Sequence, residues 1–263
     1  MGSATRKALA GTHATLAVLG RADLRVAEEL LAAGRVIGSS KQLRSALADA
    51  EADATQKRAL VQAVFGSQLG ADALALLNEI TTNRWSNSKD LLEGIEELGF
   101  RVASESAPDR PVDAELFAVQ RAVVSDSELE FALGSKLSPL DAKVALVDRL
   151  LAGKASPQTL AIVNHLVQQP RGRRIGELLR RAADIVAEQR GFEIVTVTTA
   201  SALTPEQLGR LVKGLEAQYG RALRVNTIVD SSVLGGVRVQ IGDDVIDGSV
   251  AARLSSLRQK LAG

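Results

Sequence analysis

The sequence predicts a mainly α-helical protein, with a duplicated N-terminal helical bundle followed by a small C-terminal α+β domain that contains a β-hairpin. Three observations predict this fold class. Apolar residues recur at helical spacing through residues 5–190, a block of the chain repeats at an offset of 86 residues, and the spacing changes to period two after Gly191. A run of helices followed by a block of strands is typical of separate domains rather than of one doubly wound sheet.

Helical spacing is clear in two neighbouring segments of the first part of the chain. Leu60, Val64 and Phe65 share one helical face, and Leu74 and Leu77 share a face in the next segment. An apolar stripe of this kind is typical of a helix that packs one side against a core. We therefore expect both segments to be helices of a bundle.

Three further helices are expected to begin where a hydroxyl residue precedes a proline: Ser138–Pro139, Ser156–Pro157 and Thr204–Pro205. The hydroxyl oxygen can accept a hydrogen bond from the first turn, and proline suits the first helical position. Gln207, three residues after Thr204, predicts a capping box at the third of these helix starts.

The internal repeat pairs each residue with the one 86 positions later. Between positions 43 and 78 it gives ten identities without a gap. Several are Ala or Leu, which are common in this chain, but the repeat also pairs Lys57 with Lys143 and Asn78 with Asn164. We interpret this block as a helical module that is present twice.

The composition of a linker occurs at residues 104–111, SESAPDRP, which has two prolines and several turn-forming residues. We therefore expect three domains. Residues 1–105 form the first module, residues 106–190 form the second module, and residues 191–263 form the C-terminal α+β domain.

Strand patterns dominate the C-terminal domain. The segments FEIVTVTTAS and RALRVNTIVD are rich in β-branched residues, which favour strands, and a helical pattern lies between them. Val237, Val239 and Ile241 then alternate with polar residues, and Gly242 begins a turn into a return strand. This pattern predicts a β-hairpin, and a final helix is expected from Val250 onward.

Residues typical of catalysis or metal binding are scarce. The chain has no cysteine, and its two histidines, His13 and His165, lie far apart without metal-ligand spacing to an acid. We expect each histidine on a helix surface or in a groove. Asp243, Asp244 and Asp247 lack the spacing of a calcium loop and are typical of a solvated turn. The sequence therefore predicts no catalytic, cofactor-binding or metal-binding residues, and a protein that is not an enzyme.

The densest basic cluster is PRGRR at residues 170–174. An RNA-binding helical bundle that uses Arg171, Arg173 and Arg174 is therefore an alternative interpretation. Against it, the net charge is only +1 and aromatic residues make up 3% of the chain, so neither a basic footprint nor base-stacking platforms are evident. We favour a solvated helix N-terminus or a contact with protein, and we expect the single tryptophan, Trp85, to pack inside the fold.

The hydropathy pattern gives no sign of a membrane-inserted segment. No apolar run approaches the roughly 18–20 residues that a membrane span needs, and the first residues lack the apolar core of a signal peptide. We expect a soluble, intracellular protein without direct membrane insertion.

One long motif points to a known family. The stretch DSSVLGGVRVQIGDDVIDGSVAARL, residues 230–254, resembles the C-terminal signature of the F-type ATP synthase delta subunit family, which includes the mitochondrial oligomycin-sensitivity-conferring protein. The upstream segment LVQQPRGRRIGELL extends the resemblance towards the helical region. The matching signature residues are Asp230, Leu234, Gly235, Gly236, Gly242, Asp243, Ile246, Asp247, Gly248 and Ser249.

The resemblance implies a non-catalytic subunit of the peripheral stalk, without a cofactor, at the cytoplasmic face of the bacterial cell membrane. In such proteins the helical region binds the N-terminal helix of an ATP synthase alpha subunit, and the C-terminal domain binds the b subunit. His165, Arg173 and Arg174 are candidate contact residues. The usual family member has one helical bundle, so the repeat in this chain leaves open which module binds the alpha subunit.

The hairpin admits two interpretations. It can form a platform for the b subunit together with the last helix, or its signature can serve folding alone. In both cases we expect Val237, Val239 and Ile241 to bury against helices around Leu211 and Leu254.

Overall fold

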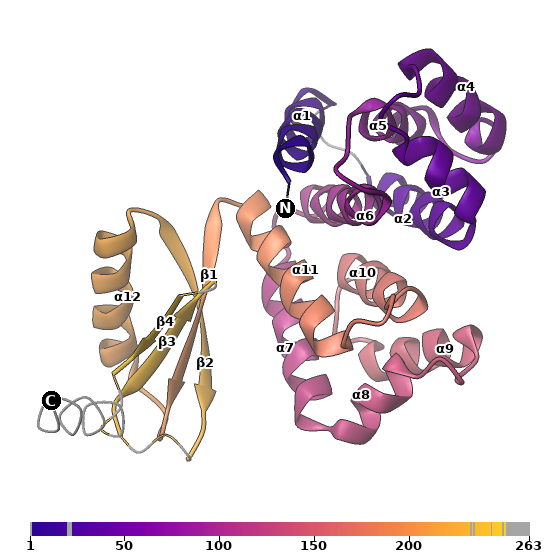
Figure 1. Ribbon diagram of the computed structural model, residues 1–263. Helices are drawn as coiled ribbons and strands as arrows, with labels where there is room; N and C mark the ends of the chain where they lie inside the picture. The colour runs from indigo at the N-terminus through magenta and orange to yellow at the C-terminus, as the bar shows by residue number, and fades with distance from the viewer. Residues whose placement is uncertain are drawn as a thin grey trace, which may run out of the picture. The chain divides into compact units, whose positions relative to one another are not determined.

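The computed structural model divides into two compact units, Met1–Val186 and Ala187–Gly263, which are described separately here (Figure 1). Helices form the first unit, and helices and strands together form the second. The structure describes residues 2–19, 23–231, 233, 235–242, 244–248 and 250.

The first unit is built from two successive sets of helices. The first set comprises α1 (Ser3–Leu19), α2 (Leu24–Ser39), α3 (Lys41–Ala48), α4 (Ala54–Phe65), α5 (Ala71–Thr82) and α6 (Ser88–Glu105). The second set comprises α7 (Val112–Ser125), α8 (Ser127–Gly134), α9 (Leu140–Leu151), α10 (Pro157–Gln168) and α11 (Ile175–Gln189), the last of which continues into the second unit.

Helix bounds follow the sequence repeat. Helices α8, α9 and α10 begin and end 86 residues after α3, α4 and α5. One tertiary contact recurs with them. Glu29 accepts a hydrogen bond from the Gly70 amide before α5 (2.7 Å), and Glu115 accepts one from the Ser156 amide before α10 (2.8 Å). Both the helix bounds and this contact are what a duplicated module would produce.

Helix α6 is the central helix of the first unit, and most of its residues are buried. Two glycines let other side chains approach its backbone. A Cβ atom at Gly99 would lie 2.6 Å from Leu31 Cδ2, and one at Gly94 would overlap the indole of Trp85. Trp85 is 3% exposed and its Nε1 donates to the Ile80 carbonyl (2.8 Å), so the expected packing role of Trp85 is confirmed.

The hydroxyl–proline pattern was predictive at two of three helix starts. Ser156 accepts from the Thr159 amide, and Thr204 forms the capping box with Gln207, so both predicted caps are confirmed. At Ser138 a helix begins near the predicted position but the predicted cap is wrong. Helix α9 begins one residue later than expected and has Pro139 at its N-cap, where no side-chain cap bond forms.

A four-stranded sheet in the order β2-β1-β3-β4 forms the second unit together with α12 (Pro205–Tyr219). Strands β1 and β2 are parallel, because α12 returns the chain to the end of the sheet at which β1 begins. Strands β3 and β4 form the antiparallel hairpin. The strands are β1 (Phe192–Thr199), β2 (Ala222–Val229), β3 (Val237–Ile241) and β4 (Asp244–Asp247).

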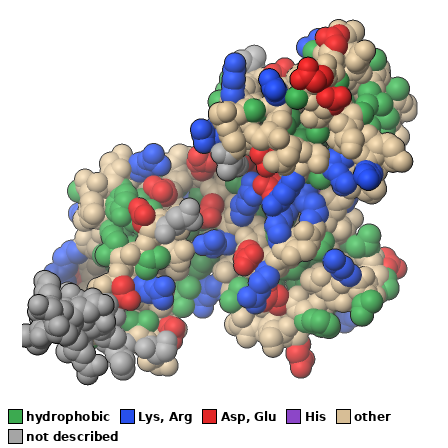
Figure 2. All heavy atoms as spheres, viewed as in Figure 1, with side chains coloured by type: hydrophobic (Ala, Val, Ile, Leu, Met, Phe, Trp, Pro, Cys, Tyr) green, Lys and Arg blue, Asp and Glu red, His purple; other side chains and the backbone are tan. Residues whose placement is uncertain are grey.

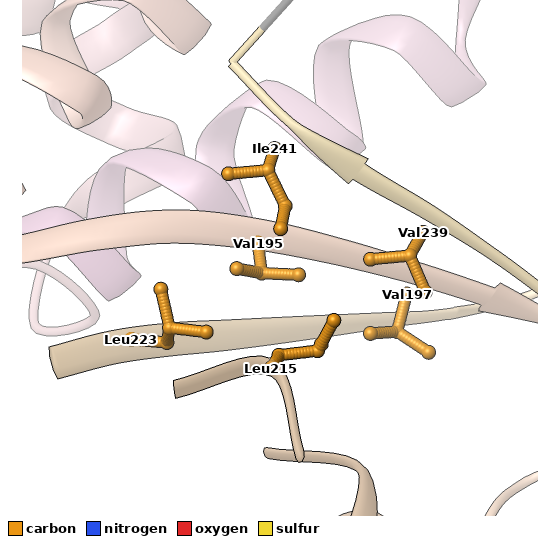
Figure 3. Close-up of a cluster of buried hydrophobic side chains, with 6 residues drawn as sticks. All are labelled: Val195, Val197, Leu215, Leu223, Val239 and Ile241. Atoms are coloured by element: carbon orange, nitrogen blue, oxygen red, sulfur yellow. The ribbon is translucent and has the colours of Figure 1, made fainter. Parts of the chain in front are cut away.

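Side chains from three strands and α12 form the core of the second unit (Figure 3). The register pairs Val195 with Ile241 and Val197 with Val239, so all four share one face of the sheet, where they pack with Leu215 of α12. The six buried residues are Val195, Val197, Leu215, Leu223, Val239 and Ile241.

The expected burial of the hairpin is confirmed for Val239 and Ile241, while Val237 and Leu211 pack against this core and are partly buried. Leu254 and the predicted final helix lie outside the described residues. The predicted fold class, mainly α with a small α+β domain and a hairpin, is confirmed. Within the described residues, no helix combines the length and the apolar character needed to cross a membrane.

We expect Gly94→Ala to destabilise the first unit. The added methyl group overlaps the Trp85 indole, and overpacking of this kind lowers the free energy of unfolding by about 1–3 kcal/mol, which exceeds the gain of up to about 1 kcal/mol in helix propensity. Urea unfolding followed by Trp85 fluorescence measures the change. Gly11→Ala is the matched control, because the nearest atoms to a Cβ there lie at 3.9 Å. Equal stability of the two variants would contradict the packing role of Gly94.

Candidate functional site

Groups that could hold a metal ion are missing from the part of the chain that the structure describes: no three His, Cys, Asp or Glu side chains are suitably grouped there. Asp244 and Asp247, two of the acids considered at the hairpin, are exposed residues of β4. Asp243 lies outside the described residues. The candidate sites considered below are the signature around the hairpin and a cluster of charged side chains in the helical unit.

The signature glycines shape the backbone around the hairpin. Gly235 and Gly236, just before β3, have φ values of +70° and +83°, and Gly242 in the turn has +54°. These left-handed conformations favour glycine because it has no Cβ. The glycine pair therefore allows the backbone to turn sharply into β3.

Backbone hydrogen bonds join the two ends of the signature. The Gly248 amide donates to the Val237 carbonyl (2.9 Å), and the Val250 amide donates to the Gly235 carbonyl (3.3 Å). A Cβ atom at Gly248 would lie 3.0 Å from the Val237 oxygen, so the close approach depends on glycine. Upstream, the Asp230 amide donates to the Thr199 carbonyl (2.8 Å) and joins the ends of β2 and β1.

The remaining signature residues differ in their surroundings. Ile246 of β4 is 40% exposed although it pairs with the buried Val239, and its neighbour Val245 is also exposed. Leu234 and Ser249, like Asp243, lie outside the described residues. The described part of the signature therefore supports the folding interpretation through its glycines and leaves apolar side chains of β4 at the surface.

A cluster of charged side chains lies where the second set of helices meets α6. Glu96 of α6 contacts Arg171, Arg173 (3.3 Å) and His165 (3.1 Å). Glu93, one turn earlier, contacts Arg173 (3.5 Å) and Arg181 (2.9 Å). We call this set the junction cluster; it comprises Glu93, Glu96, His165, Arg171, Arg173 and Arg181. Figure 2 shows Lys and Arg side chains gathered in this region of the first unit.

The loop before α11 positions Arg171 and Arg173 beside Glu96. Arg171 has a φ of +49°, a conformation that is unfavourable for a residue with a side chain, and Gly172 follows with +78°. This turn directs both Arg171 and Arg173 back towards α6. The ion pairs with Glu96 therefore compensate for the strained backbone at Arg171.

Hydrogen bonding defines the protonation state of His165. Arg35 Nη1 lies 3.3 Å from His165 Nδ1, and since a guanidinium can only donate, Nδ1 accepts. The ring proton is then on Nε2, which donates to Glu96 Oε1 at 3.1 Å. Burial lowers the pKa of His165 and outweighs the opposing effect of Glu96, so the imidazole is neutral.

Glu96 remains ionised despite its burial. Removal from water alone would raise the pKa of Glu96, but the hydrogen bond with His165 and the charges of Arg171 and Arg173 outweigh burial and lower it. Only 6% of its side chain is exposed. Three groups on other elements, His165, Arg171 and Arg173, thus surround one buried carboxylate, an arrangement that holds α6, α10 and the following loop together.

The structure separates the three contact candidates proposed from the sequence. His165 is 1% exposed and bonded inside the chain, so the expectation that it lies on a helix surface is wrong. The apolar faces of α10 and α6 bury it, which the spacing along α10 alone did not reveal. Arg173 is mostly buried and paired with Glu93 and Glu96, whereas Arg174 is 73% exposed beside Glu130 (2.8 Å). Of the three, Arg174 has the most exposed side chain.

The acidic half of the junction cluster was missed in the sequence. Glu93 and Glu96 belong to the segment LLEGIEELGF, in which apolar residues flank the acids on both sides. A helix that is apolar around most of its circumference is buried, and buried acids need cationic partners. That combination was the available signal for an internal ion-pair cluster.

We expect Glu96→Gln to lower the free energy of unfolding by about 3–5 kcal/mol, because it leaves Arg171 and Arg173 without their buried counter-charge. Chemical unfolding followed by Trp85 fluorescence measures this change. Glu130→Gln is the matched control, since its partner Arg174 is exposed and such pairs contribute about 0–1 kcal/mol. Equal effects in the two variants would show that the junction cluster does not stabilise the unit.

We expect the free energy of unfolding to fall as the pH drops through about 6.5, the ordinary pKa of histidine. The pKa of His165 is lowered in the folded protein, so the unfolded chain takes up a proton that the folded chain does not. The lowered pKa of Glu96 makes its own contribution disappear only at more acidic pH.

His165→Gln should remove this part of the slope between about pH 7.5 and about pH 5.5 in urea unfolding. His13→Gln, which removes the other histidine of the chain, is the control in which the slope attributed to His165 must persist. Coincident slopes for the original chain and His165→Gln would refute the assignment.

Comparison with known proteins identifies the family. The family model described as ATP synthase delta (OSCP) subunit matches residues 99–261. A protein of Leifsonia xyli subsp. xyli named ATP synthase subunit delta is 56% identical over 266 residues, covering 100% of both chains. A protein of the same name from Streptomyces griseus is 37% identical over 272 residues, again covering 100% of both.

A solved structure of the Toxoplasma gondii mitochondrial ATP synthase hexamer contains a chain of which 97% matches 64% of this one. Its TM-score of 0.41 and identity of 20% make the likeness too weak to carry an argument. The full-length relatives and the family model agree with each other and with the signature around the hairpin. The chain belongs to the ATP synthase delta (OSCP) subunit family.

Proposed function

We propose that this chain is a non-catalytic stator subunit in the peripheral stalk of an F-type ATP synthase. Its helical unit binds the N-terminal helix of an alpha subunit, and its C-terminal unit binds the b subunit. It thereby holds the catalytic head against the torque of the rotor. The observation that carries this proposal is the full-length similarity to relatives named ATP synthase subunit delta.

The internal structure of the helical unit suits a part that bears load. Residues 1–105 and 106–190, which we propose to be two copies of one module, contribute to a single compact unit up to Val186. The junction cluster connects α6 to the helices that follow it through buried ion pairs. Transmission of torque needs such firm internal contacts and does not need acid–base groups.

Exposed apolar side chains provide surfaces for partners. In the described part of the helical unit, most of the large exposed apolar residues belong to the second module: Val124, Phe131, Leu137, Leu140 and Leu150, with Val36 in the first. In the C-terminal unit, Val245 and Ile246 are exposed on the hairpin. Grouped apolar side chains at a surface are typical of protein-binding sites.

The RNA-binding alternative gains no support from the side-chain contacts. Arg171 and Arg173, two of the three arginines on which it depends, are paired with Glu96, and Arg174 is paired with Glu130. Carboxylates at these positions would repel phosphate. We therefore keep the stator role and place the chain, as a peripheral subunit, at the cytoplasmic face of the bacterial cell membrane.

Calorimetric titration tests the proposal. A peptide copying the N-terminal helix of the same organism's alpha subunit, and separately the soluble part of its b subunit, are titrated into the full chain. We expect saturable binding of each, with both able to bind together because they use different units. Failure of both to bind would overturn the stator role, and tight binding of single-stranded RNA instead would favour the alternative.

A further inference from the structure

We infer that the second module, and not the first, receives the partner helix, in an apolar groove between α7, α8, α9 and α10. The groove encloses about 500 Å³. This inference rests on the proposed function, because it takes the N-terminal helix of the alpha subunit as the occupant.

The groove is lined almost entirely by apolar side chains. Its walls include Ala118 and Val123 of α7, Leu133 of α8, Leu151 of α9 and Val163 of α10. Such a surface offers few hydrogen bonds to a small polar ligand or a nucleic acid. It suits apolar side chains of another protein.

Two charged residues line the groove, Glu115 and Lys154. The Glu115 carboxylate already accepts hydrogen bonds from the Ser156 amide (2.8 Å), the Ser156 hydroxyl (2.6 Å) and the Thr159 hydroxyl (2.6 Å). It therefore serves to cap α10. Lys154 is exposed, and it favours an acidic residue beside the apolar stripe of the partner.

The groove-lining side chains of the second module can be compared with those at the corresponding positions of the first module. Six groove positions carry smaller side chains than the positions 86 residues earlier, and among them are Leu151 against Phe65, Ala155 against Leu69, and Val163 against Leu77. Phe65 is 1% exposed and Leu77 is fully buried, so the first module fills the corresponding space with its own side chains. Val119 and Leu150 are larger than their counterparts Ala33 and Val64, but Leu150 is largely exposed at the rim.

The smaller side chains of the groove indicate the kind of partner that fits it. Relative to its own duplicate, the groove has a leucine in place of a phenylalanine and an alanine in place of a leucine, and the apolar face of an amphipathic helix would supply side chains to fill that space. Helices α7 and α9 have 14 and 12 residues. At 1.5 Å per residue they offer a wall of about 18–21 Å, the length of a helix of three to four turns.

The match to the family model is consistent with this choice of module. That model covers residues 99–261, which include the whole second module after α6 and leave α1–α5 outside the match. The part of the chain that is common to the family thus contains the open groove. The module whose matching space is filled is the one that the family model does not cover.

Filling the groove tests the inference. The double substitution Leu151→Phe with Ala155→Leu installs the residues of the first module. Ala122→Trp, at an exposed groove position on α7, obstructs the groove without changing buried residues. The matched control is Val36→Trp, which changes the exposed counterpart 86 residues earlier. Each full-length variant is titrated with the alpha-subunit peptide, and its melting temperature and oligomeric state are recorded.

We expect both groove variants to bind the peptide at least about tenfold more weakly than the original chain, with Val36→Trp unaffected. If the original chain binds the peptide and both folded groove variants bind it equally well, the inference is overturned while the stator role stands. Loss of binding in Val36→Trp alone would show that the first module binds the peptide, and this result would also overturn the inference. A change of oligomeric state without an effect on the peptide would make a second copy of this chain the occupant. No binding to the original chain would overturn the proposed function itself.

Discussion

The helical unit depends on one electrostatic constraint, the burial of an ionised carboxylate at Glu96. A charge removed from water is tolerated only where partners replace its hydration, and here His165, Arg171 and Arg173 do so from α10 and the loop after it. This requirement explains two local features that otherwise look unfavourable. Arg171 adopts a left-handed backbone conformation, and His165 stays neutral next to a carboxylate. Because the partners come from α10 and from the loop after it, the cluster determines how the later helices pack on α6.

Duplication in this chain preserved the scaffold while the side chains diverged. The contact from Glu29 to Gly70 recurs from Glu115 to Ser156, so the helices α5 and α10 are anchored in the same way. The space next to α5 and α10 differs between the modules. Phe65 fills it in the first module, whereas the smaller residue Leu151 leaves the groove open in the second. On our inference, one copy thus became a packed element of the stalk and the other kept a place for a partner helix.

In the C-terminal unit, the family signature includes glycines that the backbone conformation requires. Gly235, Gly236 and Gly242 have positive φ angles, and Gly248 allows two chain segments to approach closely. Four signature positions are therefore explained by geometry inside the unit. Ile246 is different, because its side chain remains exposed on β4, and it is the described signature residue with the most direct means of contacting a partner.

Most of the secondary structure could be predicted from the sequence, because helical spacing, the caps at Ser156 and Thr204, and the alternation in β3 depend on residues close together in the chain. The sequence by itself determined the fold class, the 86-residue repeat and the family. Only the tertiary structure decided what the PRGRR segment does. Arg171 and Arg173 meet one acid, Glu96, which lies 75 and 77 residues away from them in the chain, and no local pattern encodes that pairing. The open groove likewise became visible only when four helices were assembled, since its shape depends on the volume that their side chains leave unfilled.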